Sequence, residues 1–232
     1  MGMSRIILRR SVNLSKTYLV ISAFMALMAI GLSSLGFMTP STPESEIPFD
    51  LQTYFSIFFI GLASMTAILA STPVLLLFVY DKNNGVLEYL LSVGKTQSLL
   101  FRSYLQAALT IAGIVIAIEI LGNAAMMLFF HGSTALLPMI AGLTIVLGLA
   151  AVSFTTVLMM AFSSLQKQRV GANQPLGIGL GVVLILPSFF IPVIAPSYAF
   201  VMVFLNAAIA IALGVIMFLL AGRLVKREKL LP

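Results

Sequence analysis

All 13 Lys and Arg residues fall in four short stretches of the chain, and long apolar segments separate these stretches. The stretches occupy residues 5–16, 82–102, 167–169 and 223–229. Basic loop residues remain on the cytoplasmic side when a chain inserts into a membrane. An even number of membrane crossings between successive stretches therefore places every positive charge on one side. This pattern predicts a multi-pass protein of the cell membrane with both termini in the cytoplasm.

The composition favours a membrane domain and no soluble one. Hydrophobic residues make up 60% of the chain and charged residues 9%, and the mean hydropathy is +1.12. A soluble domain carries about 25% charged residues. We therefore expect residues 1–232 to form a single transmembrane domain. The net charge of +6 lacks the clustered basic face of a nucleic-acid-binding protein, and it indicates contact with anionic lipid headgroups instead.

The apolar segments predict an all-α integral membrane protein. Each segment is near or above the roughly 20 residues that cross a hydrocarbon core as a helix. We expect six transmembrane helices, at about 18–37, 53–80, 103–129, 135–165, 175–195 and 198–222.

Two further segments are expected at the membrane surfaces. On a helix, residues 4–16 place their basic side chains on one arc and apolar ones opposite, which predicts a helix in the headgroup plane. A frayed basic tail is the alternative. Residues 186–198 contain Pro187, Pro192 and Pro196, and a continuous spanning helix tolerates one proline more easily than three. We expect broken helices there that dip into the outer leaflet and return, with a kinked span and a tight turn at Pro196 as the alternative.

The loop at residues 81–95 is predicted to contain a short amphipathic helix parallel to the membrane. Residues 83–85 read Asn-Asn-Gly, which favours a turn because these residues tolerate positive φ. Residues 86–92 have a helical pattern in which Glu88 and Ser92 share the polar side, and Gly94 can end the helix. The apolar arc is predicted to comprise Val86, Leu87, Tyr89, Leu90, Leu91 and Val93.

This loop resembles the coupling loop of ABC-2-type transporter permeases. The shared pattern is D-x-x-x-G-x-L-E-x-L-L-S, followed about ten residues later by a basic residue that opens the next span. The matching residues are Asp81, Gly85, Leu87, Glu88, Leu90, Leu91, Ser92 and Arg102. The resemblance extends to the N-terminal interfacial helix, the six spans, the chain length and the proline-rich segment after the fifth span.

The resemblance implies a division of labour between subunits. Two such membrane domains pair, either as two copies or with a homologous permease, and separate cytoplasmic ATPase subunits bind ATP and Mg. The loop inserts into a cleft on each ATPase, so the chain itself would bind no cofactor and would have no ATPase site or catalytic residue. The coupling residues would be Asp81, Gly85, Leu87, Glu88, Leu91, Ser92 and Lys95. The expected function is ATP-driven transport, with export of the substrate as the expected direction.

Glu119 is the only acidic residue deep in an apolar segment. At about 1.5 Å per residue it lies about 25 Å from Arg102, which places it in the outer leaflet. Ionisable residues within spans are usually functional because burying charge in lipid is expensive. We expect Glu119 either to line a translocation path or to accept a proton. The alternative is a carboxyl near the outer headgroups, neutral or bonded to a neighbour such as Asn123.

Other function classes have weaker signals. Residues 89–96 imitate a phosphate-binding loop, but Tyr89 stands where the first glycine belongs, so we expect no ATP binding there. His131 is the single histidine and has no partners spaced as metal ligands, so no metal site is predicted. A haem-exporter-type permease and a secondary transporter remain as alternatives. An intramembrane enzyme would need a catalytic constellation that the spans lack.

Overall fold

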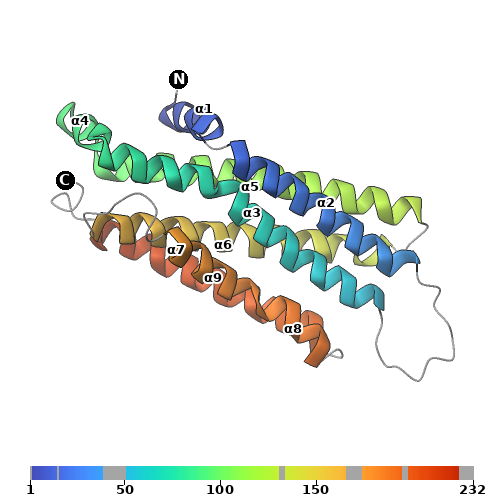
Figure 1. The fold of residues 1–232 in the computed structure, drawn as a ribbon. Coiled ribbons are helices and arrows are strands. Elements are labelled where there is room, and N and C mark those ends of the chain that lie inside the picture. The colour runs from blue at the N-terminus through green and yellow to red at the C-terminus, as the bar shows by residue number, and fades with distance from the viewer. Residues whose placement is uncertain are drawn as a thin grey trace.

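The computed structural model describes residues 2–14, 16–38, 51–130, 134–165, 174–194 and 198–224. Within these ranges the regular structure is helical, without a strand (Figure 1). The elements are α1 Met3–Leu14, α2 Lys16–Met38, α3 Leu51–Asn83, α4 Val86–Ser92, α5 Gln97–Phe129, the short 3₁₀ helix η1 Thr134–Leu136, α6 Leu137–Leu165, α7 Gln174–Ile185, α8 Pro187–Ile194 and α9 Ala199–Leu224. The predicted all-α class is confirmed for this part of the chain.

Five of the described helices are long and apolar enough to cross a membrane, which makes the chain a multi-pass membrane protein. The qualifying segments are Lys16–Gly36, Thr53–Asn83, Gln97–Phe129, Leu137–Ala161 and Ala199–Ile216. The sequence predicted six spans. The remaining segment, around 175–195, forms the two shorter helices α7 and α8.

The break between α7 and α8 follows from Pro187. Proline has no backbone N–H and its ring clashes with the carbonyl four residues earlier, so it ends α7. Its fixed φ suits the first position of a helix, and α8 begins at Pro187. The amide of Phe189 donates to the carbonyl of Leu186 at 3.0 Å across the break. A break at Leu186 fits both the broken helices and the kinked span considered from the sequence, and Pro196 lies outside the described residues.

The helix α3 is the centre of the bundle. It packs against α2, α5 and α6, and it also touches α1, α4, α7, α8 and α9. Small residues allow close approach between helix backbones. A Cβ at Gly61 of α3 would lie 3.0 Å from Phe189 Cζ of α8, and one at Gly122 of α5 would lie 2.5 Å from Ile30 Cδ1 of α2. Several helix contacts therefore depend on the absence of a side chain.

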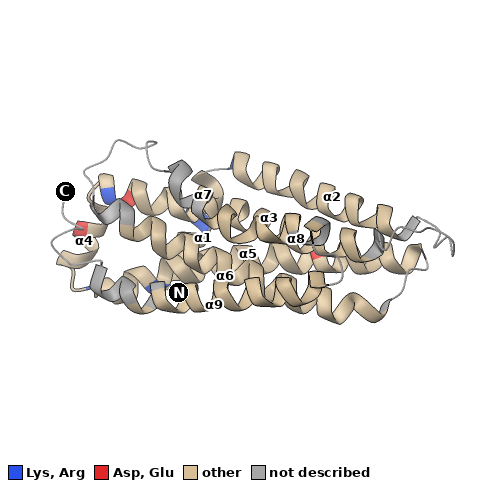
Figure 2. Cartoon of the chain, turned by 90° about the horizontal axis from the view of Figure 1, so that it is seen from below, with Lys and Arg blue, Asp and Glu red and all other residues tan. Residues whose placement is uncertain are grey.

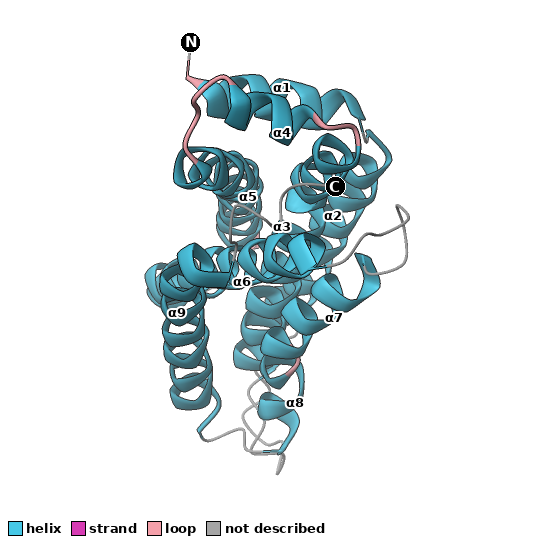
Figure 3. Cartoon of the chain, turned by 90° about the vertical axis from the view of Figure 1, so that its left-hand side faces the viewer, coloured by secondary structure: helices cyan, strands magenta, loops and turns pink. Residues whose placement is uncertain are grey.

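The helices α1 and α4 lie at the same end of the bundle, as Figures 1 and 3 show. The described Lys and Arg residues gather in the half of the molecule that carries these two helices (Figure 2). The α1 helix occupies residues predicted to form an N-terminal helix, and that element is confirmed. The charged end of the bundle is thus built from the N-terminal helix and the predicted coupling loop.

Candidate docking site at the charged end of the bundle

The helix α4 begins and ends at the residues that the sequence predicts, and two glycines set these limits. Gly85 has φ 70° and Gly94 has φ 86°, a region that residues with a side chain seldom adopt. After the last turn, the Gly94 amide donates to Leu91 O at 3.1 Å and the Lys95 amide to Leu90 O at 3.0 Å. This pair of bonds is a Schellman motif, which satisfies carbonyls at a helix end. The predicted helix and its glycine stop are confirmed.

One side of α4 is anchored in the protein. Leu87 is 1% exposed and Leu91 is 8% exposed, and both belong to a buried hydrophobic cluster. The same cluster contains Ile7 of α1, Leu77 and Phe78 of α3, and Leu100 and Tyr104 of α5. These contacts hold α4 against the ends of the two long helices that it connects.

The opposite side of α4 is exposed. Of the predicted apolar arc, Leu87 and Leu91 are buried, whereas Tyr89 and Val93 are 66% and 59% exposed. At about 100° per residue, each lies about 200° around the helix from the buried leucine two positions before it. We define the outer face of α4 as Glu88, Tyr89, Ser92 and Val93, all of which are exposed. This face combines the Glu88 carboxylate, the Ser92 and Tyr89 hydroxyls, the Tyr89 ring and the Val93 side chain.

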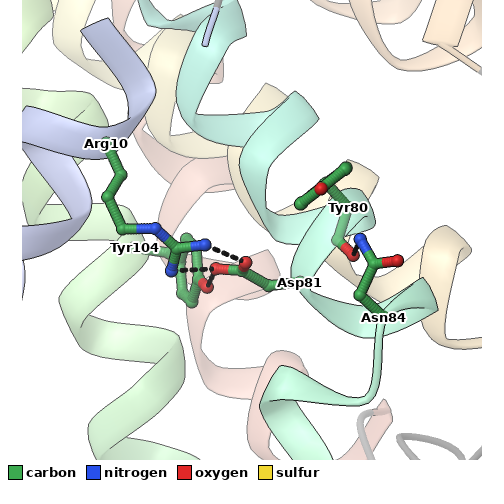
Figure 4. A network of polar contacts seen from close by, with 5 residues as sticks. All are labelled: Arg10, Tyr80, Asp81, Asn84 and Tyr104. Atoms are coloured by element: carbon green, nitrogen blue, oxygen red, sulfur yellow. Dashed lines mark hydrogen bonds and ion pairs between the residues drawn. The ribbon is translucent and has the colours of Figure 1, made fainter. Parts of the chain in front are cut away.

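A carboxylate just before α4 joins three helices (Figure 4). Asp81 of α3 is 0% exposed. Arg10 of α1 donates from Nη2 to its Oδ1 at 2.7 Å and from Nη1 to its Oδ2 at 3.1 Å. Tyr104 of α5 donates its hydroxyl to Asp81 Oδ2 at 2.5 Å. The Tyr104 ring meets Phe78 edge to face, with centroids 5.1 Å apart. Paired charges with two parallel bonds are among the stronger polar contacts in proteins.

The predicted coupling residues therefore have different surroundings. Glu88, Ser92 and Lys95 are exposed at the end of the bundle. Leu87 and Leu91 face inward, and the Asp81 carboxylate is occupied by groups of this chain. Gly85 supplies the backbone turn that starts α4.

Sequence reasoning missed Arg10 and Tyr104 as partners of Asp81. They stand 71 and 23 residues away from it along the chain, so no local pattern joins them. A usable signal was the lone acidic residue at the end of an apolar span, opposite a basic N-terminal helix. A buried carboxylate needs such a partner.

Glu119 lies in a different environment. It is 0% exposed, and neither carboxyl oxygen has a hydrogen-bond partner among the described residues. Asn123, the neighbour considered as its partner, instead accepts a bond from Ser33 of α2 at 2.7 Å. His131 lies outside the described residues. Among the described residues, no group of three His, Cys, Asp or Glu side chains lies close enough together to hold a metal ion.

An open groove of about 620 Å³ runs along α5, α6 and α9, and some of its lining residues, including Ile145 and Ile211, are exposed. Its lining is apolar apart from Ser153, whose hydroxyl donates to Leu149 O at 2.8 Å. The lining includes Leu109, Ile145 and Ile211, and it does not include Glu119. The space therefore suits hydrocarbon groups.

Comparison of the chain with protein-family models, curated proteins and solved structures gives no match. The likeness to ABC-2-type permeases accordingly rests on the loop residues and on the helical architecture.

Proposed function

We propose that this chain is the membrane-spanning permease subunit of an ATP-binding cassette transporter. In this proposal it moves a substrate across the cell membrane, most naturally outward, and a separate ATPase subunit binds and hydrolyses MgATP. The observation that carries the proposal is the outer face of α4. A seven-residue helix displays Tyr89 and Val93 to the outside while leucines fix its other side. Exposed apolar groups rimmed by polar ones are typical of a protein-binding surface.

The connections of α4 explain how docking would move the membrane helices. Short turns, residues 84–85 and 93–96, join α4 to α3 and α5. A partner that displaces α4 therefore pulls on both long helices. The Asp81 carboxylate ties α1 to the same unit. In this proposal Glu88, Ser92 and Lys95 contact the ATPase, Leu87 and Leu91 transmit its movement, and Gly85 and Asp81 maintain the loop.

The proposed topology has six crossings and both termini in the cytoplasm. The clustering of basic residues at the α1 and α4 end supports this orientation. The helix α7 has 12 residues and is about 18 Å long, which is short of a hydrocarbon core of about 30 Å. We therefore propose that α7 crosses most of the membrane and that α8 belongs to a re-entrant outer segment.

Topology can be tested by labelling, since the chain has no cysteine. A single cysteine introduced as Ser45→Cys should react with a membrane-impermeant maleimide added from outside. Reaction only from the cytoplasmic side would contradict the orientation.

The remaining parts of the proposal concern partners and substrate. A second copy or a homologous permease would complete the translocation path, and membrane lipids would surround it. The open apolar groove along α5, α6 and α9 supports an amphiphilic substrate. One observation favours the alternative of a secondary transporter, namely the buried Glu119 carboxyl, for which the described residues offer no hydrogen-bond partner.

The direct experiment is co-purification with an ATPase subunit, for which a gene next to that of this chain is the first candidate to look for. Glu88→Arg and Tyr89→Arg should remove the ATPase from the complex and abolish transport-coupled ATP hydrolysis. Asn13→Arg places the same charge at an exposed position of α1 and should leave both intact. If Glu88→Arg and Tyr89→Arg leave both readouts unchanged, the docking assignment is wrong. Transport by the purified chain alone in liposomes would favour the secondary transporter.

A further inference from the structure

The most unusual polar group in the membrane helices is the Glu119 carboxyl. It lies ten residues before the end of α5 at Phe129, about 15 Å along the axis. The side chain is 0% exposed, and both oxygens lack a hydrogen-bond partner within the described residues. Buried polar groups in native proteins are nearly always bonded, so this exception needs a physical explanation.

The polar groups around Glu119 are neutral. The Thr66 side chain of α3 lies beside the carboxyl, but its hydroxyl donates to Leu62 O at 2.9 Å. One turn further along α5, Asn123 Oδ1 is bonded to Ser33. The hydroxyl hydrogen of Thr66 is thus already donated to Leu62 O, whereas the Thr66 oxygen retains lone pairs that can accept a hydrogen bond. A carboxyl that carries a hydrogen fits this neighbour better than a carboxylate, which can only accept.

Charged groups on the surrounding helices lie far from this position. The helices that pack against α5 are α1, α2, α3, α6 and η1. The helices α6 and η1 contain no titratable or cationic residue. Those of the other helices and of α5 itself, apart from Glu119, are Arg5, Arg9 and Arg10 on α1, Lys16 and Tyr18 on α2, Tyr54, Tyr80, Asp81 and Lys82 on α3, and Arg102 and Tyr104 on α5. Tyr54 is 12 residues from Thr66, about 18 Å along α3, and Tyr104 is about 22 Å from Glu119 along α5. No cation in these helices neutralises the carboxyl.

Tight helix contacts close the site on two sides. A Cβ at Gly122 would lie 2.5 Å from Ile30 Cδ1, so α2 and α5 are in close contact. A Cβ at Gly148 of α6 would lie 2.7 Å from Ile116 Cδ1 of α5. A ligand at this closed site must be very small. A proton needs no space, and it removes the charge that burial would otherwise penalise.

We propose that Glu119 is a proton-binding site within the membrane. One carboxyl oxygen holds the proton in the conformation described here. When α5 separates from α2 or α6, water reaches the carboxyl, the O–H bond breaks, and the proton passes to that water. Closing the helices requires a proton to return. The protein would then take up and release one proton in each opening cycle, whatever drives the cycle.

Infrared spectroscopy of the full-length purified chain in an ester-free detergent tests this proposal. A protonated carboxyl has a C=O stretching band separate from those of carboxylates and amides. At neutral pH the band should be present in the wild type and in Glu88→Gln, and it should be absent from Glu119→Gln. Glu88 is the matched control because its side chain is exposed. Identical spectra for the wild type and Glu119→Gln would overturn the proposal.

A second measurement avoids substitution altogether. In wild-type protein grown with ¹³C-carboxyl glutamate, the band should shift to lower frequency, and its exchange in D₂O should be slow. The absence of a glutamate-derived band at neutral pH would overturn the proposal even if Glu119→Gln failed to fold. Neither measurement involves the ATPase, so failure of the proposed transport function leaves this test intact.

Discussion

Two buried carboxyl groups in this protein have opposite surroundings. Asp81 and Glu119 are each 0% exposed. Asp81 accepts hydrogen bonds from Arg10 and Tyr104, and these contacts fasten α1, α3 and α5 together. Glu119 accepts none from the described residues. The first carboxyl therefore contributes to the architecture, whereas the second contributes no bond that would offset its burial. Groups of the second kind in membrane helices are the stronger candidates for function.

The strongest test of the difference between the two carboxyl groups is to remove the cation that pairs with Asp81. Arg10→Met keeps much of the side-chain length but leaves a buried carboxylate with Tyr104 alone. Breaking such a pair from one side costs about 3 kcal/mol, and we expect a loss of unfolding free energy of this size in detergent. Arg9→Met, at an exposed position of the same helix, should change stability by less than about 0.5 kcal/mol.

A double substitution provides the internal check on this prediction. Arg10→Met combined with Asp81→Asn removes both charges, so it should be more stable than Arg10→Met alone. If Arg10→Met unfolds like Arg9→Met, the ion pair does not hold α1 in place.

A smaller loss is expected when Tyr104 is changed to Phe. The ring and its edge-to-face contact with Phe78 remain, and only the hydroxyl bond to Asp81 is removed. A hydrogen bond to a charged group contributes about 2 kcal/mol, and chemical unfolding should show a loss of that order. Tyr89→Phe, on the exposed face of α4, should leave stability unchanged. An equal effect of both substitutions would contradict the assignment.

The third prediction concerns the closed contacts beside Glu119. Gly148→Ala places a methyl group against Ile116, and the overpacking should cost about 1 kcal/mol. Gly142→Ala lies in the same helix with open space around it, so it should raise stability by up to about 1 kcal/mol through helix propensity. Gly148→Ala should also speed deuterium exchange of the Glu119 carboxyl. Equal changes in both variants would show that α5 and α6 are loosely packed there.

The smallest effect is expected at Glu119 itself. Glu119→Leu removes a polar group that has no hydrogen-bond partner among the described residues, so the unfolding free energy should stay within about 0.5 kcal/mol of the wild type or rise. Asp81→Leu, which leaves Arg10 and Tyr104 without their hydrogen-bond acceptor on Asp81, should be clearly destabilising in the same assay. If Glu119→Leu lowered the unfolding free energy as much as Arg10→Met, Glu119 would stabilise the fold as Asp81 does, and the contrast between the two carboxyl groups would be wrong.

The helix α4 shows how far the sequence could predict the fold. Its limits follow from local chemistry, because Gly85 and Gly94 supply backbone conformations that other residues avoid. Which part of the predicted apolar arc is buried could not be read from the sequence, because it depends on Leu87 and Leu91 entering a cluster built by distant helices. The sequence likewise placed Glu119 deep in an apolar segment. It could not show that Asn123 bonds to Ser33 instead, since α2 and α5 meet only in the folded chain.

The close approach of Phe189 to Gly61 has an evolutionary consequence. The helix α3 is continuous for 33 residues and about 50 Å, and it carries this contact toward one end and α4 at the other. A larger residue at position 61 would push against the ring, so it would be accepted only with a smaller residue at position 189. Relatives of this chain should therefore change the two positions together, and such paired changes would trace the helix that links α4 to the far end of the bundle.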